Sequence, residues 1–360
     1  MKTVRFGFTL VELLVSTAVL SMIIVMMVTL TGQASTIWRD SASKVEQFRE
    51  ARNAFESMTT RLAQATLNTY WAYNDPTNPT RYERRADLRF ISGPAETLLG
   101  AGGAHPTHAV FFQAPLGFTD NPSFRSFENT LNTLGYFLEY GSDAMQRPGF
   151  ITEELAPLRH RYRLMELRQP AEANEIYSQT APAGKTGAVI NVYSGKEWFK
   201  RSVDSGASRP VRVLAENVIA LIITPRLAEA DEKEVKGSSP DSADESPLAP
   251  SYLYDSSPGS GAQQTNPRLN PLHQLPPVLQ VTMVAIAESS ALRLQLQAGS
   301  KDHFDTKNKF SKTRDYSKDL LTSGDANSLE NLLSKQRISY RMFTTNVVIR
   351  GAKWSTEQIK

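Results

Sequence analysis

A long uncharged segment near the start of the chain dominates its hydrophobic pattern. No charged residue lies between Glu12 and Arg39, and residues 13–30 are densely apolar. The ten Leu, Ile and Val side chains of this stretch favour membrane insertion by about −3 to −6 kcal/mol, at about −0.3 to −0.6 kcal/mol each. The run is also long enough to cross a bilayer as a helix. We therefore predict a transmembrane helix over residues 8–38.

Basic residues give the orientation expected for this helix. Lys2 and Arg5 precede the apolar run, and flanking positive charge favours the cytoplasmic side of a membrane. The N-terminus is then cytoplasmic and the rest of the chain lies outside. A secretory signal peptide with small residues at Gly32 and Ala34 is one alternative, although the apolar block exceeds the usual h-region of about 7–15 residues. An ordinary membrane anchor is another.

A second, narrower apolar pattern follows the membrane segment. Apolar residues recur at steps of three and four over residues 48–65, which predicts a helix with a narrow buried seam. The seam residues are Phe48, Ala51, Phe55, Met58, Leu62 and Ala65. Because no proline occurs before Pro76, one helix of about 60 residues, or ~90 Å, is feasible. Residues 39–67 would be its soluble half, and a coiled-coil stalk is the alternative.

Beyond residue 68 the pattern changes to short strand-like runs between turn residues. The expected strands are residues 87–92, 108–114, 133–140, 161–167, 211–223, 278–287 and 341–349. A helix followed by such strands predicts an α+β fold. In this fold a long N-terminal helix, with a membrane half and a soluble half, packs on an antiparallel sheet in a head over residues 68–360. A short helix is expected over residues 328–335.

Two polar segments are expected to be solvated insertions in the head. Residues 226–270 are rich in Ser, Pro, Gly and acidic residues, which predicts a flexible loop. Seven acids between Glu229 and Glu245 leave a calcium site as an alternative, although their spacing matches no EF-hand loop. Residues 299–327 are polar and of mixed charge, and we expect a second exposed excursion there.

Composition excludes several classes of function. The formal net charge is +3, from 40 basic and 37 acidic residues, so no nucleic-acid partner is predicted. Cysteine is absent, which excludes a disulfide scaffold, thiol catalysis and thiolate metal sites.

Candidate catalytic residues are few. His105 and His108 are spaced like two helical metal ligands, but the glycines and proline around them indicate a loop with surface histidines. His160 lies in the basic tract 159–163, whose alternation suits a half-buried strand, with an anionic contact as the alternative. No nucleophile elbow, P-loop or dinucleotide fingerprint occurs. We predict a protein that is not an enzyme, with no catalytic residue, metal or cofactor.

The N-terminal junction carries a resemblance to a known family. Residues 7–15 read GFTLVELLV, which resembles the processing signal of type IV pilins and of type II secretion pseudopilins. The resemblance implies a leader of residues 1–7, cleavage after Gly7 by a prepilin peptidase, and N-methylation of Phe8. It also implies an assembly role for Glu12. A carboxylate at membrane depth is costly and usually has a partner, and the implied partner is the Phe8 amino group of a neighbouring subunit.

Motifs in the predicted head indicate which families of pilin-like proteins the chain resembles. LAENV at 214–218, LPP at 275–277 and YRMFTTNVVIR at 340–350 follow in an order similar to J-type minor pseudopilins and W-type minor pilins. The tract 52–65 is similar to the helix of those families, and residues 338–355 are also similar to the prepilin-like Verru_Chthon cassette protein C family.

The resemblance implies a structural rather than an enzymatic function. It implies a minor pilin or pseudopilin of a type IV pilus or type II secretion pseudopilus, incorporated by lateral packing of its N-terminal helix. The implied partners are the prepilin peptidase, other pilin or pseudopilin subunits and an inner-membrane assembly platform. The implied location is the bacterial inner membrane, then a filament in the periplasm or at the cell surface. The alternatives are a single-pass extracytoplasmic binding protein that does not polymerise and a membrane-tethered hydrolase.

Overall fold

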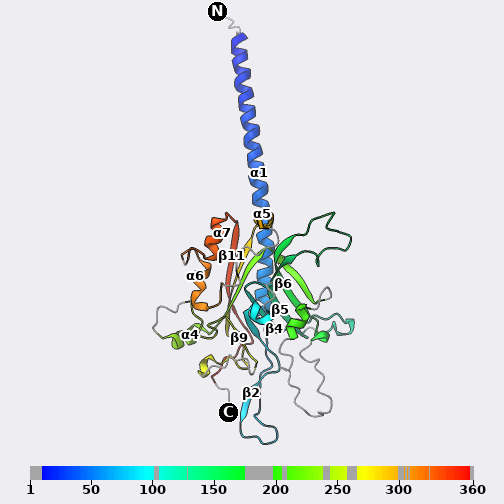
Figure 1. Cartoon of the computed structure of the whole chain (residues 1–360), viewed down its shortest axis with the longest axis vertical. Coiled ribbons are helices and arrows are strands. Elements are labelled where there is room, and N and C mark those ends of the chain that lie inside the picture. Colours follow the sequence, from blue (N-terminus) through cyan, green and yellow to red (C-terminus); the bar gives the residue numbers. More distant parts are fainter. Residues whose placement is uncertain are drawn as a thin grey trace, which may run out of the picture. The chain divides into compact units, whose positions relative to one another are not determined.

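The structure is a computed structural model of the chain (Figure 1). It describes residues 10–100, 105–127, 129–174, 198–204, 209–237, 244–257, 266–298, 304, 306, 309–323 and 325–356. The chain forms two compact units, Met1–Arg49 and Glu50–Lys360. The finer division into leader, transmembrane and soluble segments stays a prediction.

Helix α1 (Leu10–Leu62) begins in the first unit and ends in the second. Within the second unit, Ala51, Phe55, Met58 and Leu62 are all less than 8% exposed. Of the intervening charged residues, Arg52 and Glu56 are exposed and Arg61 is half-buried. The predicted seam is therefore confirmed over these turns. The Phe55 ring lies 5.8 Å from the ring of Phe343, centroid to centroid.

Antiparallel strands of the second unit form a six-stranded sheet, a three-stranded sheet and a separate hairpin. The six-stranded sheet has the order β7-β6-β5-β4-β3-β9. Its strands are β3 (Ile91–Pro94), β4 (His108–Pro115), β5 (Leu131–Ser142), β6 (His160–Gln169), β7 (Val211–Glu216) and β9 (Tyr254–Asp255). The three-stranded sheet has the order β11-β10-β8. Its strands are β8 (Val218–Arg226), β10 (Val278–Ile286) and β11 (Tyr340–Val348). The mixed α+β class with antiparallel sheets is thus confirmed.

Short helices connect these strands. The α-helices are α2 (Ala95–Leu99), α3 (Trp198–Asp204), α4 (Glu229–Lys236), α5 (Glu288–Ala298), α6 (Tyr316–Leu320) and α7 (Leu329–Lys335). The 3-10 helices are η1 (Pro122–Phe124), η2 (Ala171–Ala173), η6 (Pro267–Leu269) and η7 (Thr313–Asp315). Helix α7 confirms the helix expected over residues 328–335. It begins where the Ser328 hydroxyl caps the Asn331 N–H, because a serine oxygen satisfies a free donor of the first turn.

One expected strand is divided in two. Asn217 adopts a positive φ of 60°, a conformation that Asn tolerates better than most residues. Its N–H donates to the Tyr162 carbonyl on β6, and its carbonyl accepts from Ile286 on β10. The chain therefore passes at Asn217 from the six-stranded sheet into the three-stranded sheet. The prediction of a single strand over residues 211–223 is wrong for this reason.

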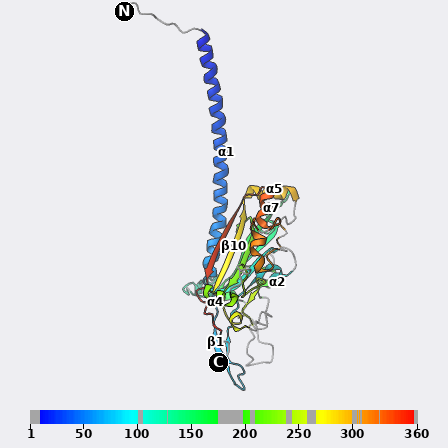
Figure 2. The ribbon, with the colours of Figure 1, turned by 90° about the vertical axis from the view of Figure 1, so that its left-hand side faces the viewer.

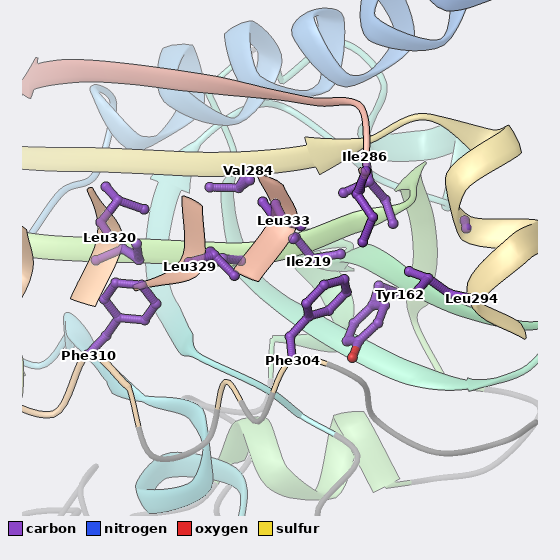
Figure 3. Packing of buried hydrophobic residues seen from close by; sticks show 14 of the residues in the cluster. Tyr162, Ile219, Val284, Ile286, Leu294, Phe304, Phe310, Leu320, Leu329 and Leu333 are labelled. Carbon is purple, nitrogen blue, oxygen red and sulfur yellow. The ribbon is translucent and has the colours of Figure 1, made fainter. Parts of the chain in front are cut away.

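A core cluster joins β8 and β10 to the C-terminal helices (Figure 3). Leu329 and Leu333 of α7 are fully buried beside Val284. Phe304 and Phe310 are 1% exposed in the same cluster. The prediction that residues 299–327 form only an exposed excursion is wrong, because aromatic side chains of this segment fill the core.

The segment 226–270 is also more ordered than predicted in its described parts. Glu229–Lys236 forms helix α4, and Tyr254 pairs with β3 through strand β9. Tyr252 and Tyr254 are fully buried. Glu232 binds Arg226 and Lys236. The flexible-loop prediction is therefore wrong for residues 229–237 and 244–257, because buried tyrosines and ion pairs offset the polar composition.

A two-stranded hairpin lies apart from both sheets. Strands β1 (Tyr70–Tyr73) and β2 (Tyr82–Arg85) pair antiparallel, and the hairpin extends from the rest of the head (Figures 1 and 2). The sequence analysis did not predict it. The strand expected over residues 87–92 is displaced to Ile91–Pro94.

Candidate functional site

The apolar part of α1 has the properties required to cross a membrane. Residues Leu10–Ser35 have a mean hydropathy of 2.5, and none of this window is buried within the part of the chain that the structure describes. Twenty-six helical residues extend about 39 Å, which exceeds a hydrocarbon core of about 30 Å. The length and composition of the predicted membrane helix are therefore confirmed, and its orientation stays a prediction.

Hydroxyl side chains inside this segment bond to the helix itself. Ser16, Thr17 and Ser21 donate to carbonyls three or four residues earlier, at 2.6–3.0 Å. Thr29 and Thr31 do the same at 2.6 and 2.8 Å. In lipid a polar group needs a partner within the protein, and these internal bonds meet that need. These five hydroxyl groups are thus compatible with hydrocarbon.

Glu12 is the one acidic residue of the apolar segment and lies in the first turn of α1. A negative charge is favourable near a helix N-terminus because of the helix dipole. The Ser16 hydroxyl donates to the Glu12 backbone carbonyl rather than to the carboxylate. The predicted processing residues Gly7 and Phe8 lie outside the described residues, as do Lys2 and Arg5. Their relation to Glu12 stays a prediction.

The far end of α1 meets a buried carboxylate of the head. Glu166 on β6 is fully buried, and its Oε1 binds Arg61 Nη1 at the last turn of α1. The Tyr136 hydroxyl donates to the same oxygen at 2.9 Å. Arg212 Nε donates to Glu166 Oε2 at 2.6 Å. A buried carboxylate that receives three donors is well compensated.

Burial also changes the titration of Tyr136 in this cluster. Desolvation and the nearby Glu166 carboxylate raise the pKa of the Tyr136 hydroxyl well above its ordinary value. The phenol therefore keeps its proton and remains a hydrogen-bond donor to Glu166 at physiological pH. The sequence analysis missed this cluster, since Glu166 and Tyr136 lie on strands that carry no local sign of pairing with a helix.

Two arginines of the basic tract 159–163 prove to be internal. Arg159 is exposed and His160 is half-buried at the start of β6, but Arg161 and Arg163 are 3% and 0% exposed rather than on a solvated face. Arg161 pairs with Glu288 at 2.8 Å and Arg163 with Glu216 at 3.5 Å. The half-buried prediction is wrong because carboxylates from other segments neutralise these arginines. The same pairs leave little basis for an anionic ligand at this tract.

The two closely spaced histidines differ from each other. His105 is partly buried and contacts the Leu138 carbonyl. His108 begins β4 and is 1% exposed, so the prediction of surface histidines is wrong for it. Its Nδ1 accepts from the Ile223 N–H at 3.0 Å, and its Nε2 lies 2.9 Å from the Phe310 carbonyl. Desolvation lowers the pKa of His108 to about 4. His108 is a neutral core residue.

Among the residues that the structure describes, no group of three His, Cys, Asp or Glu side chains is placed to hold a metal ion. The chain matches no protein-family model, no curated protein and no solved structure.

Proposed function

We propose that the chain is a minor pilin or pseudopilin, a non-enzymatic structural subunit of a type IV pilus or type II secretion pseudopilus. The observation that supports it most strongly is helix α1. An exposed apolar segment and a buried, head-contacting segment belong to one continuous helix (Leu10–Leu62). The pattern GFTLVELLV at residues 7–15, which resembles a prepilin signal, includes the first described residues of this helix, from Leu10 on.

In this proposal the exposed apolar surface of α1 is covered first by lipid and then by neighbouring subunits. Cleavage after Gly7 frees the amino group of Phe8, which is then methylated. That amine, on a neighbouring subunit, approaches the Glu12 carboxylate. Pairing removes the cost of two charges in an apolar medium, and it sets the axial stagger between subunits. An ATPase of the assembly platform supplies the energy for extraction from the inner membrane.

The second half of α1 would hold the head in place on the filament. Phe55 contacts Phe343 of β11, and Arg61 binds Glu166 of β6, so both sheets contribute a contact to the helix. We propose that these contacts are part of packing along the whole soluble half, as the α+β pilin architecture requires. The head would then lie in the periplasm or at the cell surface.

Mass spectrometry of the mature N-terminus tests the proposal. The chain is expressed with and without an active prepilin peptidase. We expect loss of residues 1–7 and one added methyl group only when the peptidase is present. Recovery of the intact, unmethylated N-terminus in both strains contradicts the proposal.

The role of Glu12 has a separate test. Glu12→Ala is expected to enter the membrane normally but to fail in filament incorporation, because the partner of the Phe8 amine is lost. Leu13→Ala, the adjacent substitution, is the matched control and is expected to incorporate. Incorporation is measured by crosslinking of sheared filaments. Equal incorporation of both variants contradicts the pairing.

A second candidate is a membrane-anchored binding protein that does not polymerise. A cleft of about 550 Å³ in the head favours it, because ligand sites are typically clefts of about 300–1,000 Å³. The peptidase experiment separates the two candidates, since only a prepilin loses its leader through that enzyme.

A further inference from the structure

The β1–β2 hairpin carries a close pair of tyrosines at its loop end. Tyr73 on β1 pairs with Tyr82 on β2. The Asn74 N–H donates to the Arg81 carbonyl at 3.0 Å, which places these two residues at a hydrogen-bonded position of the ladder. Such positions alternate, so Tyr73 and Tyr82 form a non-hydrogen-bonded pair, in which opposite side chains are closest. The backbone pairing therefore brings the two rings together.

The two rings are stacked with their hydroxyl groups aligned. The ring centroids lie 4.8 Å apart and the ring planes are inclined by 27°. The Tyr82 hydroxyl donates to the Tyr73 hydroxyl oxygen at 3.1 Å. Because both the oxygens and the ring centres are close, the ortho carbons beside the two hydroxyl groups also face each other. In this arrangement two phenoxyl radicals can join through a carbon–carbon bond.

Hydrogen bonds in the hairpin loop hold the tyrosine pair in place. The Asn74 carboxamide oxygen accepts from the backbone N–H groups of Thr80 and Arg81 at 3.0 and 3.1 Å. The Asn74 amide nitrogen donates to the Thr80 hydroxyl at 3.0 Å. These bonds close the loop and fix the register that opposes Tyr73 to Tyr82.

Solvent exposure distinguishes this pair from another pair of adjacent tyrosine rings in the head. Tyr73 and Tyr82 are 47% and 45% exposed, so an oxidant in solution can reach both rings. The Tyr140 and Tyr162 ring centroids lie 4.4 Å apart, but Tyr162 is 4% exposed and belongs to a core cluster. An oxidant that acts from solution should therefore modify the hairpin pair and spare the core pair.

The hairpin is a part of the head that a covalent link would stabilise. Its two strands pair with each other and with neither of the larger sheets, and it extends from the rest of the head (Figures 1 and 2). An isolated two-stranded hairpin is only marginally stable in water. The chain contains no cysteine, so no disulfide can link the strands. A bond between Tyr73 and Tyr82 would close the loop covalently and lower the entropy of its open state.

We propose that Tyr73 and Tyr82 are the site of an intramolecular dityrosine cross-link, formed with hydrogen peroxide and a haem peroxidase. Each phenol loses one electron and one proton, and the two phenoxyl radicals join through one ortho carbon of each ring. Each ortho hydrogen then moves as a proton to the phenolic oxygen, which restores both phenols. In the net reaction one ortho C–H bond breaks on each ring and one C–C bond forms. The two electrons and two protons released reduce one peroxide to two water molecules. This modification goes beyond the proposed structural role and does not depend on it.

Tryptic peptide mapping after oxidation tests the proposal. The purified full-length protein in detergent micelles is treated with hydrogen peroxide and a haem peroxidase at low protein concentration, which favours coupling within one molecule. Trypsin cleaves after Arg61, Arg81 and Arg84, which separates peptide 62–81 from peptide 82–84. We expect the monomer to show dityrosine fluorescence and to yield these peptides joined, two hydrogen atoms lighter than their sum. Recovery of the two peptides only in unlinked form overturns the proposal.

Two phenylalanine substitutions identify the linked residue within peptide 62–81. Tyr73→Phe keeps the ring but removes the phenol, so it should abolish the linked species. Tyr70→Phe is the matched control and should keep it. Tyr70 is 43% exposed but lies on the opposite face of the hairpin, where its hydroxyl donates to Asp87 at 3.0 Å. Equal yields from the two variants, or a cross-link through Tyr162 instead, overturn the proposal.

Hydrogen exchange tests the effect of the link on the hairpin. The Asn74 N–H, which donates to the Arg81 carbonyl, should exchange more slowly in the oxidised protein than in the oxidised Tyr73→Phe variant. Equal exchange in the two samples overturns the stabilising role of the bond. Circular dichroism confirms that each variant is folded, and none of these results depends on processing of the N-terminus or on filament assembly.

Discussion

The two ends of helix α1 have the same backbone structure and opposite surroundings. The large apolar side chains of residues 10–30 are 51–80% exposed, whereas Phe55, Met58 and Leu62 are at most 7% exposed. Apolar surface is stabilised by removal from water wherever it lies. The head covers the apolar residues of α1 between 50 and 62, whereas within the described chain nothing buries residues 10–35; in the proposed function a membrane and then neighbouring subunits cover them. The buried turns of α1 therefore contribute to the stability of the fold, whereas the exposed turns are available to associate with other apolar surfaces.

The difference extends to the acidic residues. Glu166, which binds the last turn of α1, receives its donors from Arg61, Tyr136 and Arg212 of the same chain. Glu12, in the first turn, is proposed to meet a donor from another subunit. Substitutions near the last turn of α1 should therefore change the stability of the fold. Substitutions near its first turn should change membrane or filament association.

The largest effect on stability is expected when Glu166, the sheet residue that binds the last turn of α1, is replaced. Glu166→Ala leaves Arg61, Arg212 and the Tyr136 hydroxyl without their buried acceptor, which should lower the free energy of unfolding by about 3–5 kcal/mol. Glu56→Ala is the control, since Glu56 is 59% exposed and pairs with Arg52 on the helix surface. That pair contributes about 0.3–0.5 kcal/mol. Urea unfolding in detergent measures both values, and similar values would remove Glu166 as a stabilising contact.

A matched pair of methionines compares the two parts of α1 directly. Met58 is fully buried and Met26 is 63% exposed. Met58→Ala should lower the free energy of unfolding of the head by about 2–5 kcal/mol. Met26→Ala should change it by less than about 0.5 kcal/mol. Near-ultraviolet circular dichroism during urea unfolding follows the head aromatics. A large effect of Met26→Ala would show that the apolar segment contributes to the head fold.

The first part of α1 should respond instead to charge in the membrane. Ile23→Arg places a cation near the centre of the apolar segment and should oppose insertion by about 3 kcal/mol. Gln33→Arg, near the end of the segment, is the control, because a long basic side chain there reaches the interface. Alkaline extraction of membranes measures retention. Equal retention of the two variants would contradict a membrane-spanning role, while head stability is expected to stay unchanged in both.

Sequence alone predicts the features that depend on local periodicity. The apolar segment, the seam through Phe55 and Met58, and strands such as β4 and β10 follow from spacing that neighbouring residues impose. The β1–β2 hairpin was missed because its aromatic and charged residues carry little apolar alternation. The break at Asn217 was missed because the pairing of β7 and β8 with different sheets is decided by distant strands.

The candidate sites differ in the same way. The N-terminal pattern is linear, so the sequence alone places Gly7, Phe8 and Glu12 as candidate residues. The Glu166 cluster and the cleft at the base of the β1–β2 hairpin are assembled from distant segments, and no spacing in the sequence indicates them. From the sequence alone, charged residues in β6 such as Arg163 indicate a solvated face, because their distant partners, such as Glu216, are not apparent.

The smallest expected effect is a pH dependence confined to the head, since no histidine lies in residues 1–49. Burial lowers the pKa of His108 from 6.5 to about 4, so the unfolded chain binds more protons than the folded one between these values. Stability is therefore present above pH 6.5 and falls as the pH drops toward 4. Between pH 6.5 and 5.5 His108 should contribute a loss of about 1 kcal/mol. His108→Gln should reduce the slope of unfolding free energy against pH relative to the unchanged protein. An identical slope in the variant and the unchanged protein would mean that His108 is protonated in the folded head, against its acceptance of the Ile223 N–H.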